Sequence, residues 1–376
     1  MAHAYTPGLK VTEYTLIRRE RRLPLKGDVL ASMGDEVTGD TVVARTELPG
    51  DVQPLNLAGL LGVAPQDLAG YLSKKPGDKI QKDETIAETK GFFGLMKNQV
   101  KSPINGTIES ISNVTGQAIL RNPPTPVEVD AYIDGKVVEI FKGEGVTVET
   151  YATFVQGIFG IGGEVKGIIV PIVESPKDPI TIDMITPELK GKVAVGGSLV
   201  TVDVIRKAVD VGCIGIVSGG IWDYDLREFL GYDIGVAITG SEEKGITIII
   251  TEGFGEMPMA EKTFRLLKEN SGKKASINGA TQIRAGVMRP EVIIPKVETK
   301  KTKEGDREDK PSKGVEIGSP VRIIREPHFG NIGKVTALPS ELQVIETEAK
   351  VRVLEAELEN GERVIVPRAN VELIEE

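Results

Sequence analysis

The C-terminal sequence decides what fold this part of the chain can adopt. Residues 316–335 read EIGSPVRIIREPHFGNIGKV, and residues 358–376 read LENGERVIVPRANVELIEE. An apolar run follows Gly318, residues 327–330 turn the chain, and a second strand starts at Gly333. Glycine turns between short alternating strands are typical of a small, tightly curved barrel. Residues 362–367 and 371–374 supply the expected closing strands.

These residues resemble the KOW motif of NusG-type elongation factors and several ribosomal proteins. The resemblance covers residues 314–376 and implies an SH3-like β-barrel that docks to RNA or to nucleic-acid machinery, without catalysis. The docking face that it implies combines basic and polar side chains with one ring for stacking: Arg322, Arg325, His328, Phe329, Asn331 and Lys334.

The charge of this segment limits the RNA interpretation. Residues 316–376 contain 7 Lys and Arg against 12 Asp and Glu, a net charge of -5, whereas a barrel that grips RNA is expected to be basic. Alternatively, Phe329 fills the barrel mouth and Arg322 pairs with a nearby glutamate. A protein partner, including a second copy of this chain, is therefore favoured over RNA or a ribonucleoprotein.

A second resemblance covers residues 23–150. Short strands separated by Gly-Asp turns recur at residues 27–44 and 77–87, followed by SPINGTIESI at residues 102–111. They resemble the barrel-sandwich hybrid of biotinyl and lipoyl carrier domains, which hold a cofactor on a hairpin lysine. Lys97 is too close to Pro103 for that role, and Asn98 follows it in place of methionine. The resemblance therefore implies the fold without the cofactor.

Two features flank this region. Residues 1–22 end in the basic run RRERR, which indicates a solvated strand edge or extended arm, or else a docking arm for an acidic partner. Residues 127–133 and 136–141 alternate apolar and polar side chains around Asp134-Gly135, which predicts a β-hairpin.

From residue 151 to residue 295 the pattern predicts an α/β domain. Alternation of apolar runs with helical patterns is typical of a mainly parallel sheet flanked by helices. The runs lie at residues 167–173, 192–195, 213–217, 235–239, 246–251 and 290–295, and the helical patterns at 201–211, 223–230 and 259–270. Residues 296–313, KVETKKTKEGDREDKPSK, are predicted to be a flexible charged linker because their composition offers almost nothing to bury.

The expected fold is thus multidomain, β and α/β. It comprises an N-terminal arm (1–22), a barrel-sandwich hybrid domain (23–150), an α/β domain with a mainly parallel sheet (151–295), a linker (296–313) and a KOW-like SH3 barrel (314–376).

A second set of candidate binding positions lies in the α/β domain. Several predicted strands end at glycine turns, and ligands bind open α/β sheets beyond the carboxyl ends of the strands. Backbone N–H groups there could hold an anion, but tight turns need glycine in any case. Residues 275–287 suggest either a pocket rim or a hairpin turning at Asn278-Gly279. The candidates are Gly196, Gly197, Ser198, Gly219, Gly220, Asn278, Gly279, Thr281 and Arg284.

Composition excludes several classes of function. A net charge of -9 disfavours a protein that coats nucleic acid. One cysteine, Cys213, and two histidines argue against an internal disulfide or a Cys/His metal site. No catalytic motif is present, and Asp223 and Asp225 are read as helix-capping residues. The N-terminus lacks an apolar signal-peptide core, and the apolar stretch at residues 154–173 is interrupted by charges, so a cytoplasmic protein without a membrane span is expected.

These observations predict a non-enzymatic modular binding or adaptor protein that docks through its KOW-like barrel, without a cofactor. Two alternatives stay open. One is a small-anion-binding sensor or enzyme at the glycine turns, and the other is a self-assembling structural protein.

Overall fold

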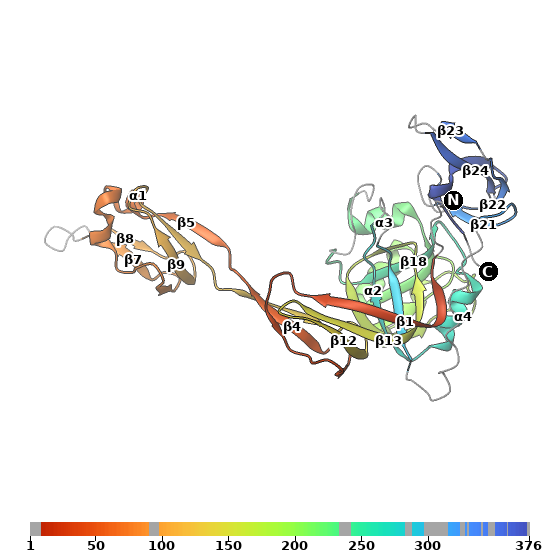
Figure 1. Ribbon diagram of the computed structural model, residues 1–376, viewed down its shortest axis with the longest axis horizontal. Coiled ribbons are helices and arrows are strands. Elements are labelled where there is room, and N and C mark those ends of the chain that lie inside the picture. The colour runs from red at the N-terminus through yellow and green to blue at the C-terminus, as the bar shows by residue number, and fades with distance from the viewer. Residues whose placement is uncertain are drawn as a thin grey trace.

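The computed structural model describes residues 9–89, 98–232, 242–282, 288–296, 315–323, 328, 331–339, 341–344, 350–358 and 360–373. Most of the regular structure is β, arranged in several sheets of mixed direction. Figure 1 shows a large body, a small lobe carried on a narrow ribbon, and a C-terminal β unit beside the body.

The body is built on an 11-stranded sheet. Four strands in the middle lie parallel and in chain order: β15 (Glu164–Pro171), β16 (Lys192–Val195), β17 (Gly215–Ile221) and β18 (Thr247–Phe254). Antiparallel strands flank them: β14 (Phe159–Ile161) beside β18, and β19 (Lys274–Asn278), β20 (Glu291–Pro295) and β13 (Gly145–Gln156) beyond β15.

The prediction of a mainly parallel sheet is therefore wrong for the sheet as a whole. Parallel neighbours need a crossover connection, and such crossovers link only β15 through β18. Between β19 and β20 the structure assigns no crossover helix to the described residues, and these two strands pair antiparallel.

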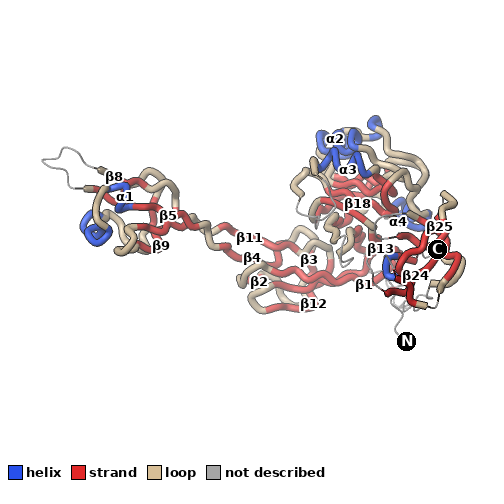
Figure 2. The backbone as a smooth tube through the Cα atoms, turned by 90° about the horizontal axis from the view of Figure 1, so that it is seen from above, coloured by secondary structure: helices blue, strands red, loops and turns tan. Residues whose placement is uncertain are grey.

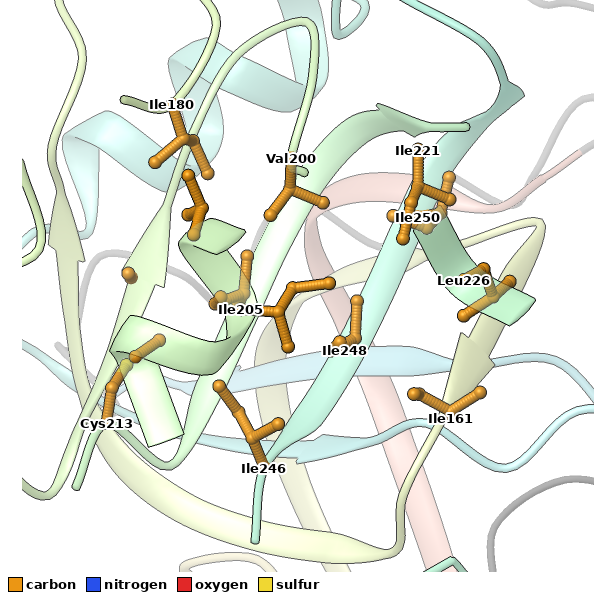
Figure 3. Packing of buried hydrophobic residues seen from close by; sticks show 14 of the residues in the cluster. Ile161, Ile180, Val200, Ile205, Cys213, Ile221, Leu226, Ile246, Ile248 and Ile250 are labelled. Carbon is orange, nitrogen blue, oxygen red and sulfur yellow. The ribbon is translucent and has the colours of Figure 1, made fainter. Parts of the chain in front are cut away.

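Successive side chains of the central strands point into two different cores, as the pleat requires. On β16, Ala194 joins the core covered by α2 (Val202–Val211) and α3 (Asp223–Leu230), whereas Val193 and Val195 join the core covered by α4 (Glu261–Glu269). Figure 3 shows the first core, where Ile205 and Leu226 meet Ile248 and Ile250. Two 3₁₀ turns, η2 (Ile182–Met184) and η3 (Pro187–Leu189), precede β16.

The helices predicted at residues 201–211 and 223–230 are confirmed, with Thr201 as the N-cap of α2. The third helix begins two residues later than predicted, at Glu261. The run at residues 235–239 lies outside the described residues.

One chain segment links two strands that are far apart in the strand order. β13 continues through Gly157 and Ile158 into β14. Gly157 N–H donates to the carbonyl of Pro290 at 2.9 Å, and Ile158 N–H donates to that of Ile250, also at 2.9 Å. Gly157 is therefore hydrogen-bonded to the residue that precedes β20, and Ile158 is hydrogen-bonded to β18.

The basic run near the N-terminus lies in β1 (Val11–Arg22), which pairs antiparallel with β13 with one irregularity between Thr12 and Thr15. Each arginine of the run makes an ion pair within the chain, so this part of the expected arm belongs to the sheet. The carboxylate partners are Glu149 for Arg18, Glu291 for Arg19, Glu164 and Asp130 for Arg21, and Glu20 and Glu144 for Arg22.

The predicted hairpin at Asp134-Gly135 is wrong. β11 (Thr125–Asp130) pairs with β4 (Val42–Leu48), whereas β12 (Gly135–Phe141) pairs with β13 and β3 (Glu36–Val37). Tyr132 adopts a left-handed conformation, with φ of 64°. Its N–H donates to the carbonyl of Gly39 at 3.0 Å. These contacts lead the chain from one sheet into another instead of back along the same strand.

The buried side chain of Tyr132, between β11 and β12, gives a testable prediction about stability. The residue is 1% exposed, and its hydroxyl has no hydrogen-bond partner among the described residues. Burial raises the pKa of Tyr132 well above its usual value. We expect Tyr132→Phe to be as stable as the parent or up to about 2 kcal/mol more stable, because an unsatisfied buried hydroxyl is removed. Urea denaturation measures this difference, and a loss above about 1 kcal/mol would show that the hydroxyl is satisfied.

Charged side chains tie the base of the ribbon to the body. Lys274 of β19 contacts Asp40 at 2.6 Å and Asp134 at 3.7 Å. Lys166 of β15 contacts Asp40 at 3.4 Å and also pairs with Asp130. Three carboxylates at the base of the ribbon, those of Asp40, Asp130 and Asp134, thus meet two ammonium groups of the sheet.

This network predicts a pH dependence. The hydrogen bond from Lys274 lowers the pKa of Asp40, so the stability that Asp40 contributes is present above its unfolded pKa of about 3.9 and is lost as the pH falls through the lower folded value. Asp40 is 64% exposed, and we therefore expect Asp40→Asn to cost less than about 1 kcal/mol at pH 7. Urea denaturation of both proteins should show this gap closing below about pH 3, and a gap independent of pH would contradict the assignment.

The ribbon comprises β2 (Asp28–Val29), β4 and β11 and ends in the lobe (Figure 2). The lobe contains a four-stranded sheet of β5 (Val52–Asn56), β10 (Gln117–Arg121), β9 (Gly106–Ile111) and β6 (Lys79–Ile80). It also contains the pair β7 (Thr85–Glu88) and β8 (Gln99–Lys101), α1 (Leu57–Leu61) and the 3₁₀ helix η1 (Pro65–Tyr71). Residues 23–150 thus contribute to the lobe, the ribbon and the large sheet.

The C-terminal unit is a β-meander with its own core. The strand order is β25 (Arg363–Pro367), β24 (Lys350–Leu358), β22 (Ile332–Ala337), β21 (Pro320–Ile323) and β26 (Val371–Leu373). β23 (Leu342–Val344) also pairs with β24, and the 3₁₀ turn η4 (Arg368–Asn370) joins β25 to β26. The strands predicted around residues 321, 333, 363 and 371 are confirmed.

Candidate functional site at the carboxyl ends of the parallel strands

The structure brings the first group of candidate residues together. Gly196, Gly197 and Ser198 follow β16, and Gly219 and Gly220 lie near the end of β17. Gly219 N–H donates to the carbonyl of Gly197 at 2.7 Å, and Val200 N–H donates to that of Gly220 at 3.0 Å. The turns therefore meet at one edge of the sheet, where α/β proteins bind ligands.

The chain itself fills the space between these turns. A Cβ on Gly219 would lie 2.1 Å from the carbonyl oxygen of Met257, and one on Gly220 would lie 2.1 Å from that of Gly255. A Cβ on Gly197 would lie 2.4 Å from the carbonyl oxygen of Asp178. These glycines are thus required by close backbone packing.

The N–H groups that an anion would need are also engaged at three positions. Gly196 donates to Val217, Ser198 to Asp178 and Gly219 to Gly197, all at carbonyl oxygens within 3.0 Å. An anion at this edge would have to displace bonds that already hold the turns together. The geometry therefore favours the structural interpretation of the turns over an anion site.

The second group of candidates lies elsewhere. Asn278 pairs with Glu164, the first residue of β15, so it sits at the opposite end of the parallel strands. Thr281 Oγ1 accepts from Gly160 N–H at 2.9 Å, and a Cβ on Gly279 would lie 1.9 Å from the carbonyl oxygen of Ile161. These residues fasten β14 to the end of β19. Arg284 lies outside the described residues.

The alternative of a two-residue turn at Asn278-Gly279 is wrong. β19 ends at Asn278 and β20 begins at Glu291, so residues 279–290 connect them. Asn278 Oδ1 instead accepts from Ala280 N–H at 2.9 Å, which shapes the start of this longer connection.

A buried ion pair joins the C-terminal unit to the body at the carboxyl end of β18. Glu252 Oε2 accepts from the guanidinium of Arg322, and Glu252 Oε1 accepts from Ala260 N–H at 3.0 Å. The exposures of Arg322 and Glu252 are 4% and 7%. Arg322 therefore contacts its own chain instead of contributing to an outward docking face. Glu252 was missed from sequence, although a carboxylate directly after the run ITIIIT is a visible signal.

The remaining residues of the expected docking face are only partly described. Asn331 and Lys334 are exposed, and His328 is half-buried. Arg325 and Phe329 lie outside the described residues. Asn331 and Lys334 are thus the exposed residues of this face within the described part of the chain.

Sequence reasoning also missed an aromatic pair beside the glycine turns. Trp222 directly follows β17 and is the N-cap residue of α3. Its ring stacks with that of Tyr224, with centroids 6.0 Å apart and an interplanar angle of 12°. Trp222 is 38% exposed and Tyr224 is 63% exposed. The signal in the sequence was the WDY triplet that contains the single tryptophan.

Metal and thiol chemistry find no support in the part of the chain that the structure describes. No cluster of three or more His, Cys, Asp or Glu side chains is arranged there to hold a metal ion. Burial raises the pKa of the Cys213 thiol, which lies 3.3 Å from the carbonyl oxygen of Lys192. No helix among the described residues is both long and apolar enough to cross a membrane.

Comparison with protein-family models gives no match, and comparison with curated proteins gives no relative.

Proposed function

We propose that this chain is a non-enzymatic modular binding protein that presents two docking units, the lobe and the C-terminal unit, on one body. The observation that carries this proposal is the position of the lobe, which projects from the body at the end of the ribbon (Figures 1 and 2). An independently packed unit held out on a ribbon has most of its surface available to a partner.

The lobe has its own core and several exposed apolar side chains. Leu57, Leu68, Ile86, Ile108 and Leu120 are all buried within it. Three other apolar side chains, Val52, Leu60 and Val114, are more than half exposed. Exposed apolar side chains on a small projecting unit can be buried against a partner protein, which supports a role in protein binding.

Charge supports a protein partner over RNA. Residues 49–124 hold 8 Lys and Arg against 7 Asp and Glu, which is close to neutral, and the C-terminal segment is acidic. Neither segment carries the net positive charge that is typical of phosphate-binding proteins. The order of the C-terminal strands and the 3₁₀ turn before β26 support the proposal of an SH3-like unit.

The barrel-sandwich hybrid was expected for residues 23–150, and we now propose it for the lobe alone, because the strands of residues 23–48 and 125–150 lie in the ribbon and the large sheet. The alternative of an anion-binding enzyme or sensor is weakened by the backbone that fills the glycine turns.

The ribbon allows a clean test. Leu48 of β4 and Thr125 of β11 are direct partners at its far end, so residues 49–124 can be replaced by Asn-Gly, a sequence that favours tight hairpin turns. The excised variant is expected to keep a folded body, as judged by circular dichroism and thermal unfolding, and to lose the partner that the full chain captures from its native lysate.

A second variant lacking residues 315–376 separates the contributions of the two units. Capture should be repeated after nuclease treatment to identify partners held through RNA. Identical partners for the full chain and both variants would contradict the proposal. Capture of this chain alone would favour the self-assembling alternative.

A further inference from the structure

Two short chain segments, residues 49–51 and 122–124, connect the ribbon to the lobe. They lie between the last residue pair of the ribbon, Leu48 with Thr125, and the paired strands β5 and β10 of the lobe. We call these two segments the junction. Three of their six residues are prolines, which have no N–H to donate to a neighbouring strand. The junction is therefore poorly suited to continue either sheet.

Few contacts hold the two junction segments together. Among the described residues, one backbone hydrogen bond crosses the junction, from Asn122 N–H to the carbonyl of Asp51 at 2.9 Å. No junction residue belongs to the apolar core of the lobe or to the core at the base of the ribbon, and these two cores share no residue. A connection with so few hydrogen bonds and no core of its own bends more easily than the sheets on either side of it.

The guanidinium of Arg121 links the lobe to the junction. Its Nε and Nη2 donate to the two carboxylate oxygens of Glu109 on β9, at 3.0 and 2.9 Å. This two-point contact fixes the plane of the guanidinium against the lobe sheet. Nη1 donates to the carbonyl of Gly50 at 2.8 Å. Because Gly50 lies on the ribbon side of Asp51, bending at the junction would separate this carbonyl from the guanidinium.

The contact between Arg121 and Glu109 is weak enough to be released. The two side chains are 35% and 43% exposed, so both charges can be hydrated when the pair opens. Exposed ion pairs contribute little to stability and are screened by salt. The guanidinium can therefore favour one direction of the lobe without preventing others.

We propose that the junction is a hinge and that Arg121 is a latch that keeps the lobe in the direction shown in Figures 1 and 2. When the guanidinium releases Gly50, the lobe turns as one unit, because its core lies entirely beyond the junction. The base of the ribbon stays in place, because Lys274 pairs there with Asp40 and Asp134. This inference goes beyond the proposed docking role, which does not require the lobe to move.

Single-molecule energy transfer in the full-length protein tests the hinge. One dye is attached at Asn113→Cys in the lobe and the other at Lys207→Cys on α2, since both positions are exposed. The buried Cys213 is replaced by alanine so that only the introduced cysteines react. The parent should show one main efficiency population.

Two substitutions remove the latch in different ways. Glu109→Gln removes the carboxylate that orients the guanidinium, and Arg121→Met removes the guanidinium while keeping an apolar side chain. Glu109→Gln should raise the ratio of other populations to the main one by about two- to fivefold, the factor that corresponds to an exposed ion pair. Arg121→Met should raise it at least as much, because the bond to Gly50 is lost as well.

A matched ion pair within the ribbon provides the first control. Arg45 contacts Asp28 at 3.7 Å, and these side chains are 58% and 75% exposed. Arg45→Met should leave the distribution of the parent unchanged, because this pair lies outside the junction. A second dye pair inside the lobe, at Asn113→Cys and Lys75→Cys, should report the same distance in every variant if the lobe stays folded.

Salt separates the latch from other contacts. Raising the salt concentration from about 20 mM to about 1 M shortens the screening length to about 3 Å. This should shift the parent toward the distribution of Arg121→Met and change that variant much less.

Three results would overturn the inference. Distributions that are the same in the parent and in both latch variants would show that other contacts fix the lobe. An equal effect of Arg45→Met would indicate general softness of the ribbon without a latch. A change within the lobe itself would show that the latch variants unfold the lobe instead of turning it.

Discussion

Removing the guanidinium of Arg322 is expected to detach the C-terminal unit from the body. Arg322→Ala leaves the Glu252 carboxylate nearly buried without its cation. Breaking a buried ion pair by removing one partner typically costs about 3–5 kcal/mol, because the remaining charge must be rehydrated or left uncompensated. The C-terminal unit should therefore no longer stay docked on the body in the variant.

Limited proteolysis within residues 297–314 and small-angle scattering measure this detachment. The variant should be cleaved faster between the two units and show a larger radius of gyration. Arg363→Ala is the matched control, because Arg363 pairs with Glu355 and Glu357 but is 66% exposed. Replacing both charges, with Glu252→Leu and Arg322→Met, should restore much of the docking. Unchanged proteolysis of Arg322→Ala would show that other contacts hold the unit.

A methyl group at Gly219 is expected to destabilise the body strongly. The added Cβ would lie 2.1 Å from the carbonyl oxygen of Met257 and 2.6 Å from that of Gly197. Backbone atoms cannot rotate away as a side chain can. We therefore expect Gly219→Ala to lower the free energy of unfolding by about 3 kcal/mol or more, at the upper end of overpacking effects. Denaturation by guanidinium chloride provides the measurement.

Gly70→Ala serves as the control for this substitution. A Cβ at Gly70 meets nothing within 4 Å, so the change should be neutral or stabilise the lobe by up to about 1 kcal/mol. Equal effects at the two positions would contradict the role assigned to the glycine turns. They would also reopen the question of whether the carboxyl edge has room for a ligand.

The central helices and strands were predictable because their signals are local. Val204, Ile205 and Ala208 lie at helical spacing and all face the same core. Strands β16 and β18 contain continuous apolar runs, residues 193–195 and 248–250, as expected for strands buried on both faces. Their order followed from the alternation of elements. The partner of each strand was not predictable. The sequences of β11 and β12 both fit a strand equally well, and only contacts with residues far away in sequence place the two in different sheets.

The candidate site was also predictable only where its signals are local in the sequence. The sequence and the rules for α/β sheets predicted that the turns after β16 and β17 would converge. They could not predict that residues 255–259 would pass between the turns, because this depends on atomic contacts across the fold. The partner of Arg322 is 70 residues away in sequence, and no local pattern connects the two.

The register of the ribbon has an evolutionary consequence. The chain leaves β4 at Leu48 and returns to β11 at Thr125, which are paired residues. Asp51 and Asn122 are still hydrogen-bonded across the gap, at 2.9 Å. The lobe is therefore an insertion whose two ends meet, so its loss or exchange would disturb only one turn. In related chains we expect the lobe to differ in size or sequence while the core of the body stays the same.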